Sequence, residues 1–256
     1  MYKVLLLAGG RGTRLSEHTG TTPKPLVEAK GRPLLWHIMQ NYSRFEFNEF
    51  IILAGYKSFQ IKEYFANFWL HDADIEIDLS KSTTTLLSDT ARNWKIQILD
   101  TGLDAQTGSR VLSARRYLGE VFFLTYGDGV GSVDIKELVK SHTESGKMVT
   151  VTAVRPPSRF GALTIENGSV VGFQEKPSGN SDWINGGFFV CNKEVLDSLW
   201  EKDCSFEYDV LPKLAREGHV NVFMHEGSWQ PVDNIRDLER LEEGLSQGDY
   251  PWYRKE

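Results

Sequence analysis

The stretch VLLLAGGRGTRL, residues 4–15, decides the fold of this 256-residue chain. Its first part, VLLLA, is a short apolar run that is typical of a buried strand. Gly9, Gly10 and Gly12 follow at once, and residues without a Cβ let several backbone N–H groups approach a phosphate group closely. The stretch therefore predicts a strand that ends in a phosphate-binding loop, with an ordinary glycine turn at the surface as the alternative.

Patterns of period two and of 3.6 residues alternate along the first 155 residues. They predict strands at 2–8, 49–55, 95–101, 120–129 and 148–154, and helices at 33–45, 57–69 and 134–146. Pro33 is well placed to open the first of these helices, and Gly146 to close the last. Alternating strands and helices predict a parallel, doubly wound sheet, which binds ligands beyond the carboxyl ends of its strands.

The pattern changes after residue 156. Residues 160–177 hold an Asn167–Gly168 pair between two alternating apolar runs, which predicts a β-hairpin. The remaining expected elements are a strand at 184–192, two helices within 193–218, a strand at 220–226 and a helix at 234–245. Residues 71–92 are the least regular stretch, in which 82–87 is either a strand or an excursion from the fold.

We expect one α/β domain over residues 1–256. Residues 1–155 would form the mostly parallel, doubly wound sheet, and residues 156–256 a smaller hairpin and helical part that supplies a lid or wall. Hydrophobic residues make up 40% of the chain and charged residues 25%, as in a globular enzyme or binding domain. The net charge of −6 gives no support for a nucleic-acid or anionic membrane partner.

The cysteines and the apolar segments indicate the compartment. Cys191 and Cys204 have no second pair near them, so two free thiols in a reducing cytosol are expected rather than a disulfide or a zinc site. The apolar start is too short for a signal segment, and no apolar run reaches the roughly 18 residues of a membrane span. The sequence thus predicts a cytoplasmic protein.

The glycine loop fits neither of two better-known phosphate loops. A Walker loop ends in Gly-Lys-Ser/Thr, whereas this one has Gly-Thr-Arg, and a dinucleotide loop needs a small residue where Leu15 stands. The remaining possibility is a phosphate loop with its own cations, Arg14 and Lys24. Pro23 and Pro25 fix φ beside Lys24 and stop a helix there, which would hold the lysine over the loop. A solvated lysine in a surface turn is the alternative.

Several blocks of sequence carry a family resemblance. LLLAGGRGTRL, TPKPLVE and GRPLLWHI together resemble the signature of the sugar-phosphate nucleotidyltransferases, which have a Rossmann-like fold. Further blocks are similar, in order and across nearly the whole chain, to the cytidylyltransferases of glucose 1-phosphate: GYKSFQIKEYFANFWLH, ILDTGLDAQTGSRV, FLTYGDGV, RFGAL, FQEKP, INGGFFV and WQPVDNIRD. That family joins CTP to glucose 1-phosphate, releases pyrophosphate and makes CDP-glucose for deoxysugar and surface-polysaccharide synthesis.

The resemblance implies roles at the nucleotide end of the site. Nucleotidyl transfer is an in-line attack on the α-phosphorus, so catalysis comes from positioning and from offsetting charge. Arg14 and Lys24 would stabilise the transition state and the leaving pyrophosphate, and Asp128 and Asp233 would hold Mg²⁺. The nucleotide would contact Leu7, Ala8, Gly9, Gly10, Gly12, Thr13 and Gly127, and its cytosine would be read by Thr101, Gly102, Thr107 and Arg110.

The second part of the chain would bind the sugar. By the same resemblance Lys176 binds the phosphate of the acceptor and Glu175 a sugar hydroxyl, while Asn185 and Gly186 line the sugar pocket. Family members are commonly multimeric, so the resemblance also implies a homo-oligomer. The aromatic cluster Tyr64, Phe65, Phe68 and Trp69 is expected in the core or at a subunit contact, and His37 as a packing residue.

Other functions compete with this one. A cytidylyltransferase for a different phosphorylated acceptor has the same loop and carboxylates. A non-catalytic nucleotide-sugar-binding regulator would be expected to lose the loop cations or the metal carboxylates, and Arg14, Lys24, Asp128 and Asp233 are all present. The loop already disfavours a dinucleotide-dependent oxidoreductase.

Overall fold

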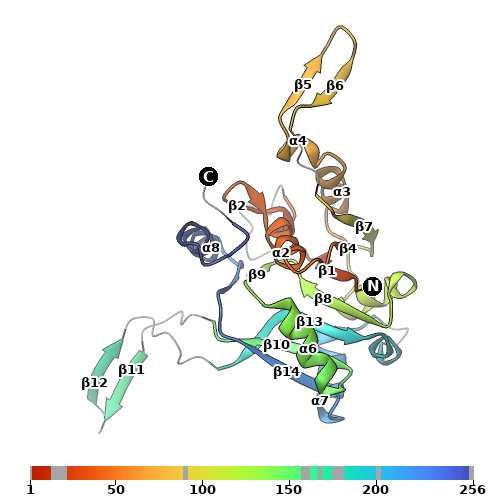
Figure 1. The fold of residues 1–256 in the computed structure, drawn as a ribbon. Helices are drawn as coiled ribbons and strands as arrows, with labels where there is room; N and C mark the ends of the chain where they lie inside the picture. The colour runs from red at the N-terminus through yellow and green to blue at the C-terminus, as the bar shows by residue number, and fades with distance from the viewer. Residues whose placement is uncertain are drawn as a thin grey trace.

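A seven-stranded mixed sheet forms the centre of the computed structural model, which describes residues 2–12, 22–88, 92–156, 162–166, 169–174, 182–199 and 203–253 (Figure 1). The strand order is β14-β10-β13-β8-β1-β4-β7. In that order the strands are Val220–His225, Val149–Val154, Ile184–Asn192, Val121–Tyr126, Val4–Ala8, Glu49–Ala54 and Lys95–Asp100.

The sheet is mostly parallel, as the alternating pattern predicts. β1 pairs in parallel with β4 and β8, and β4 pairs in parallel with β7. β13 runs antiparallel to both of its neighbours, β8 and β10, while β10 and β14 are parallel. The α/β, doubly wound class is therefore confirmed, with one reversed strand that period-two patterning alone does not reveal.

Helices cover both faces of the sheet because the strands are apolar on both sides. Val4 and Leu6 of β1 belong to one buried cluster, together with residues of α2 (Leu34–Ser43), α6 (Ile135–Ser145) and α8 (Ile235–Gln247). Leu5 belongs to the other cluster, with residues of α5 (Thr107–Ser113) and α7 (Leu211–Arg216). The strict alternation along β1 thus divides the core into two layers.

Two hairpins extend from this body in different directions (Figure 1). One pairs β5 (Ile75–Asp78) with β6 (Thr83–Leu86), within the stretch that the sequence leaves irregular. Both alternatives for residues 82–87 therefore hold in part, since the segment contains a strand and that strand leaves the main sheet. The other hairpin pairs β11 (Ala162–Glu166) with β12 (Ser169–Gln174), as expected, while its Asn167–Gly168 turn lies outside the described residues.

Two short two-stranded sheets complete the described strands. β2 (Glu28–Ala29) pairs with β3 (Arg32–Pro33), and β9 (Gly129–Gly131) pairs with β15 (Trp229–Pro231). The second pairing matters for the site, because it carries the chain after β15 to the end of β8. Val232 N donates to the Asp128 carbonyl at 2.9 Å and closes this connection.

Several helix predictions need correction. The expected helix 57–69 is α3 (Ser58–Ala66), followed after a turn by α4 (Trp69–Asp72). Of the two helices expected in 193–218, the first is the 3₁₀ helix η4 (Lys193–Ser198), and the second is α7 preceded by one π turn, η5 (Phe206–Val210). The Pro23–Pro25 segment does not exclude helical backbone, because it forms a single 3₁₀ turn, η2 (Lys24–Leu26), whose φ angles proline tolerates.

Other local predictions hold. Gly146 ends α6 in the left-handed region at φ 60°, and Pro33 immediately precedes α2. Among the described residues no helix is long and apolar enough to cross a membrane. Cys191 and Cys204 are both buried and form no disulfide.

Candidate active site

A cavity of about 690 Å³ opens where β1 and β8 end. This is the position at which an open parallel sheet binds its ligands. Its lining comes from the glycine loop, η2, α5, the end of β8, η5 and the turn after β15. The lining residues are Leu7, Ala8, Gly9, Gly10, Gly12, Lys24, Pro25, Ala105, Gln106, Thr107, Arg110, Tyr126, Gly127, Asp128, Ser205, Glu207, Tyr208 and Asp233.

Two of the loop glycines, Gly9 and Gly12, are required for different reasons. Gly12 has φ 61°, a conformation that side chains with a Cβ rarely adopt. At Gly9 a Cβ would overlap Nη1 of Arg110, so the close approach is first of all to a protein side chain. The sequence predicts close approach of a phosphate to this loop, which stays a prediction, and does not reveal that Arg110 packs against Gly9.

The Arg110 side chain connects the segments that form one wall of the cavity. Its Nη1 donates to Gly102 O at 2.8 Å and Thr101 Oγ1 at 2.5 Å, with a longer contact to Ala54 O. Its Nη2 donates to Leu103 O at 3.2 Å and Gly9 O at 3.3 Å. The residue is buried, and burial lowers the pKa of its guanidinium below the ordinary value. One side chain thereby ties the glycine loop to β4 and to the loop after β7.

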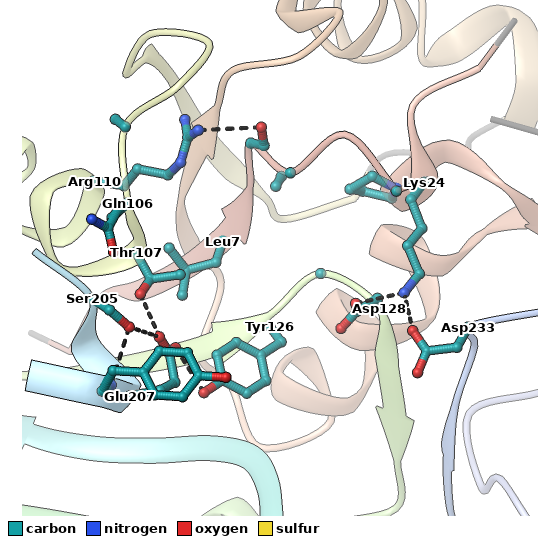
Figure 2. A pocket seen from close by; sticks show the side chains of 18 residues that line it. Leu7, Lys24, Gln106, Thr107, Arg110, Tyr126, Asp128, Ser205, Glu207 and Asp233 are labelled. Atoms are coloured by element: carbon teal, nitrogen blue, oxygen red, sulfur yellow. Dashed lines mark hydrogen bonds and ion pairs between the residues drawn. The ribbon is translucent and has the colours of Figure 1, made fainter. Parts of the chain in front are cut away.

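Lys24 bridges the two carboxylates on the other side of the cavity (Figure 2). Its Nζ lies 2.7 Å from Asp128 Oδ2 and 2.8 Å from Asp233 Oδ1, and its side chain is 11% exposed. Burial disfavours the charged amine, but the charges and hydrogen bonds of the two aspartates outweigh this effect and raise the pKa of Lys24. The chain thus converges on this point from η2, the end of β8 and the turn after β15.

Asp128 and Asp233 also have the chemistry of a shared metal site. A cationic group already lies within hydrogen-bond distance of one oxygen of each, and Mg²⁺ prefers such oxygen ligands. Within the described residues, no group of three or more His, Cys, Asp and Glu side chains could hold a metal by itself. The two carboxylates therefore fit a metal whose remaining ligands are phosphate oxygens and water.

A third polar cluster was not predicted from the sequence. Glu207 accepts hydrogen bonds from Thr107 Oγ1 at 2.5 Å, Ser205 Oγ at 2.9 Å and Tyr126 OH at 2.8 Å. Glu207 comes from η5, and π turns in helices are frequent at functional sites. The segment FEYDV carries no motif, so only the proximity of η5 to α5 and β8 in the fold identifies Glu207.

The predicted site residues fall into three groups. The cavity brings together Leu7, Ala8, Gly9, Gly10, Gly12, Lys24, Thr107, Arg110, Gly127, Asp128 and Asp233. Thr101, Gly102, Asn185 and Gly186 do not line it, although the first two bind Arg110 and Asn185 Nδ2 donates to Tyr126 OH at 3.0 Å. Thr13, Arg14, Glu175 and Lys176 lie outside the described residues.

This chain belongs to the nucleotidyl transferase family, whose model matches residues 3–248. It is 44% identical to the glucose-1-phosphate cytidylyltransferase of Salmonella typhi over 252 residues, which cover 98% of each chain. It is 41% identical to a probable glucose-1-phosphate cytidylyltransferase of Bacillus subtilis, again over 98% of each chain. These relatives agree with the resemblance that the sequence motifs carry.

Solved structures share the fold at lower identity. The crystal structure of HddC from Yersinia pseudotuberculosis superposes with a TM-score of 0.70 at 24% identity, covering 96% of this chain and 100% of that one. The inositol-1-phosphate CTP transferase from T. maritima gives a TM-score of 0.67 at 20% identity, with 96% of each chain covered. These similarities support the α/β fold described above.

Proposed function

We propose that this enzyme transfers CMP from CTP to glucose 1-phosphate and releases pyrophosphate, giving CDP-glucose. The observation that carries the proposal is the position of Lys24, whose ammonium meets Asp128 and Asp233 in the same cavity as the glycine loop. Relatives at 44% and 41% identity over nearly the whole chain supply the identity of the two substrates. Such an enzyme would serve the synthesis of nucleotide sugars and polysaccharides.

The chemistry needs positioning and charge rather than a protein nucleophile. The two reactants bring roughly six negative charges, which repel each other by several kcal/mol in a partly enclosed site. Lys24 would bind the phosphates of the nucleotide and offset charge as the pyrophosphate leaves. The glycine loop would donate backbone N–H groups to the same phosphates, and Arg14 would add a second cation.

Asp128 and Asp233 would hold Mg²⁺, which when bound neutralises phosphate charge during the transfer. Their carboxylates belong to different segments, so the metal site forms only when the turn after β15 lies against the end of β8. Thr107 and Arg110 would orient the cytosine, Arg110 through the loop carbonyls that it holds. Asn185 and Gly186, with Glu175 and Lys176, would bind the sugar phosphate.

Pyrophosphate release tests the proposal. The enzyme is incubated with Mg²⁺, each of ATP, GTP, CTP, UTP and dTTP, and glucose, galactose or mannose 1-phosphate. We expect release with CTP and glucose 1-phosphate well above every other pair. Release only with CTP and another phosphorylated acceptor would contradict the glucose assignment, and no release with any pair would contradict catalysis and favour a regulatory binding protein.

We also propose that the protein is a cytoplasmic homo-oligomer. Two buried cysteines that form no disulfide suit a reducing compartment. The β5–β6 hairpin exposes Ile77, Leu79, Leu86 and Leu87, with exposed fractions of 56%, 86%, 50% and 62%. Exposed apolar side chains gathered on one projecting hairpin are typical of an interaction site, and a second copy of this chain is the partner we propose.

A further inference from the structure

One wall of the cavity is organised around the carboxylate of Glu207, away from Lys24 (Figure 2). Three hydroxyl groups from separate segments converge on it. They are those of Thr107 at the start of α5, Tyr126 at the end of β8 and Ser205 just before η5. All four residues line the cavity, so a bound substrate meets this cluster directly.

The carboxylate fixes the direction of all three hydroxyl protons. A carboxylate has no proton to give, so Thr107, Ser205 and Tyr126 must each donate to it. None of the three hydroxyl protons is then available to a ligand.

The hydroxyl oxygens also accept bonds from the protein. Thr107 Oγ1 accepts from Phe206 N at 2.9 Å, and Ser205 Oγ accepts from Tyr208 N at 3.1 Å. Tyr126 OH accepts from Asn185 Nδ2, and Gly187 N fixes that amide by donating to Asn185 Oδ1 at 2.8 Å. Counted over the described part of the chain, the capacity that these hydroxyls and the carboxylate retain is for accepting hydrogen bonds.

We propose that Glu207 is a specificity-determining residue, because it makes this wall accept a hydrogen bond from a donor group of a substrate and disfavour an acceptor group. The inference rests on the proposed function. An acceptor of the ligand placed against this wall would lose its water without gaining a partner, which costs more than the bond itself contributes. The ligand group that binds against this wall is therefore an N–H or O–H donor.

Both substrates carry such a donor. Cytosine has an amino group at the ring position where uracil and thymine have a carbonyl oxygen, so an acceptor wall there would select the base. Glucose 1-phosphate offers hydroxyl groups, and galactose 1-phosphate directs one of them differently. Thr107 is predicted to contact the cytosine, and its hydroxyl donates to Glu207. Asn185 is predicted to contact the sugar, and its amide donates to the Tyr126 hydroxyl of the same cluster.

The substitution Glu207→Gln tests the role. It keeps the shape of the side chain but replaces one acceptor oxygen with a donating amide. Two selectivity ratios of kcat/KM are measured in wild type and variant: CTP against UTP, and glucose 1-phosphate against galactose 1-phosphate. We expect one ratio to fall at least about tenfold, and which one falls identifies the group that the wall binds. If both ratios stay within about twofold of wild type, Glu207 is not a specificity residue.

Two further variants keep the test decisive. Asp209→Asn removes the same charge from the same π turn and should leave both ratios unchanged, because Asp209 is not part of the cavity lining and its Oδ2 accepts from the backbone N of Ser205 rather than from the Ser205 hydroxyl. If Glu207→Gln fails to fold by circular dichroism, Thr107→Val removes one hydroxyl that Glu207 orients and should lower one of the two ratios, whereas two unchanged ratios would contradict the role of Glu207. Inactive wild type would contradict the proposed function, whereas unchanged ratios in an active variant contradict only the role of Glu207.

Discussion

Lys24 and Asp128 form an ion pair of 2.7 Å between Nζ and Oδ2, and Asp233 Oδ1 receives the same ammonium at 2.8 Å. The ammonium thus lies between the two carboxylates proposed for the metal. A cation that arrives with the nucleotide has to share or replace these contacts. The phosphates of the nucleotide would give Lys24 a new partner at that moment.

Lys24→Met should lower kcat by about 10²- to 10³-fold, as expected when one oriented transition-state donor is lost. Methionine keeps much of the buried stem, so the loss reflects the charge rather than the packing. Steady-state pyrophosphate release measures it. Lys62→Met is the matched control, since it removes one positive charge from a pair with Asp100 outside the cavity lining. Equal effects of the two substitutions would contradict the role of Lys24.

Lys24→Met should also bind a divalent metal more tightly than wild type when no nucleotide is present. Without the ammonium, Asp128 and Asp233 lose the cation that now competes for them. We expect the Kd for Mn²⁺, measured by electron paramagnetic resonance of the free ion, to fall about tenfold in Lys24→Met, an amount typical of a partly buried charge pair. An unchanged Kd would show that Lys24 and the metal do not share these carboxylates.

Arg110→Ala should destabilise the protein by about 2–4 kcal/mol, because several buried carbonyls lose their donor at once. Urea denaturation measures the loss. Arg110→Lys should restore little of it, since one ammonium cannot reach both Gly9 O and Gly102 O as the planar guanidinium does. A loss below about 0.5 kcal/mol for the alanine variant would show that the hydrogen bonds of the Arg110 side chain are not needed for stability.

The hydrogen bonds of the Arg110 side chain also have a functional consequence. If Arg110 orients the glycine loop for the base, Arg110→Ala should reduce the preference for CTP over UTP in pyrophosphate release. Ser113→Ala offers a control on the same helix, because Ser113 Oγ donates to the Arg110 main-chain carbonyl and not to the Arg110 side chain. An unaltered CTP preference in Arg110→Ala would count against a role of Arg110 at the base.

Because His37 is buried, we expect the protein to lose stability in acid. His37 is fully buried, its Nε2 lies 2.9 Å from Ala29 O, and Trp252 Nε1 donates to its Nδ1 at 3.3 Å. Burial lowers the pKa of His37 from 6.5 to about 4, so below pH 6.5 the unfolded chain binds a proton that the folded protein resists. Stability from His37 is complete above pH 6.5 and falls as pH decreases toward 4.

The expected loss from His37 alone is about 2 kcal/mol between pH 8 and pH 5. Urea denaturation of wild type and His37→Gln at the two pH values isolates it, because all other titrating groups cancel in the difference. If both proteins lose the same free energy of unfolding, the pKa of His37 is not lowered by burial.

We expect the β5–β6 hairpin to form the contact between subunits of the proposed homo-oligomer. Ile77→Lys with Leu79→Lys should convert the oligomer to a monomer, because the charges cannot be buried against a second copy. Light scattering after size-exclusion chromatography gives the mass. Met224→Lys, on the edge strand β14, is the control for an exposed apolar side chain elsewhere. A monomeric wild type would contradict the proposed homo-oligomer.

The sequence predicts the fold well where local pattern decides the structure. The apolar run Val4–Ala8 and the glycines after it place the cavity, because a parallel sheet has its ligand site at that edge. The reversed strand β13 is not predicted, since strand direction depends on pairing across the sheet and not on periodicity. The π turn at Phe206–Val210 likewise carries no local signal.

The site is predictable to the extent that motifs mark it. Lys24 between two prolines and Asp128 between two glycines are visible in the sequence, and both line the cavity. Glu207 is not visible, because its role depends on three hydroxyls that are distant in the chain and meet only in the fold. The carbonyl contacts of Arg110 are equally long-range, so the sequence identifies the residue but not its partners.

Product analysis tests the central claim most directly. The enzyme is incubated with Mg²⁺, glucose 1-phosphate and CTP labelled at the α-phosphate. The products are separated by chromatography and identified by mass spectrometry. We predict that the label appears in CDP-glucose and that an equal amount of unlabelled pyrophosphate is formed. Label in CMP alone, or label that remains in CTP, would contradict nucleotidyl transfer to glucose 1-phosphate by this protein.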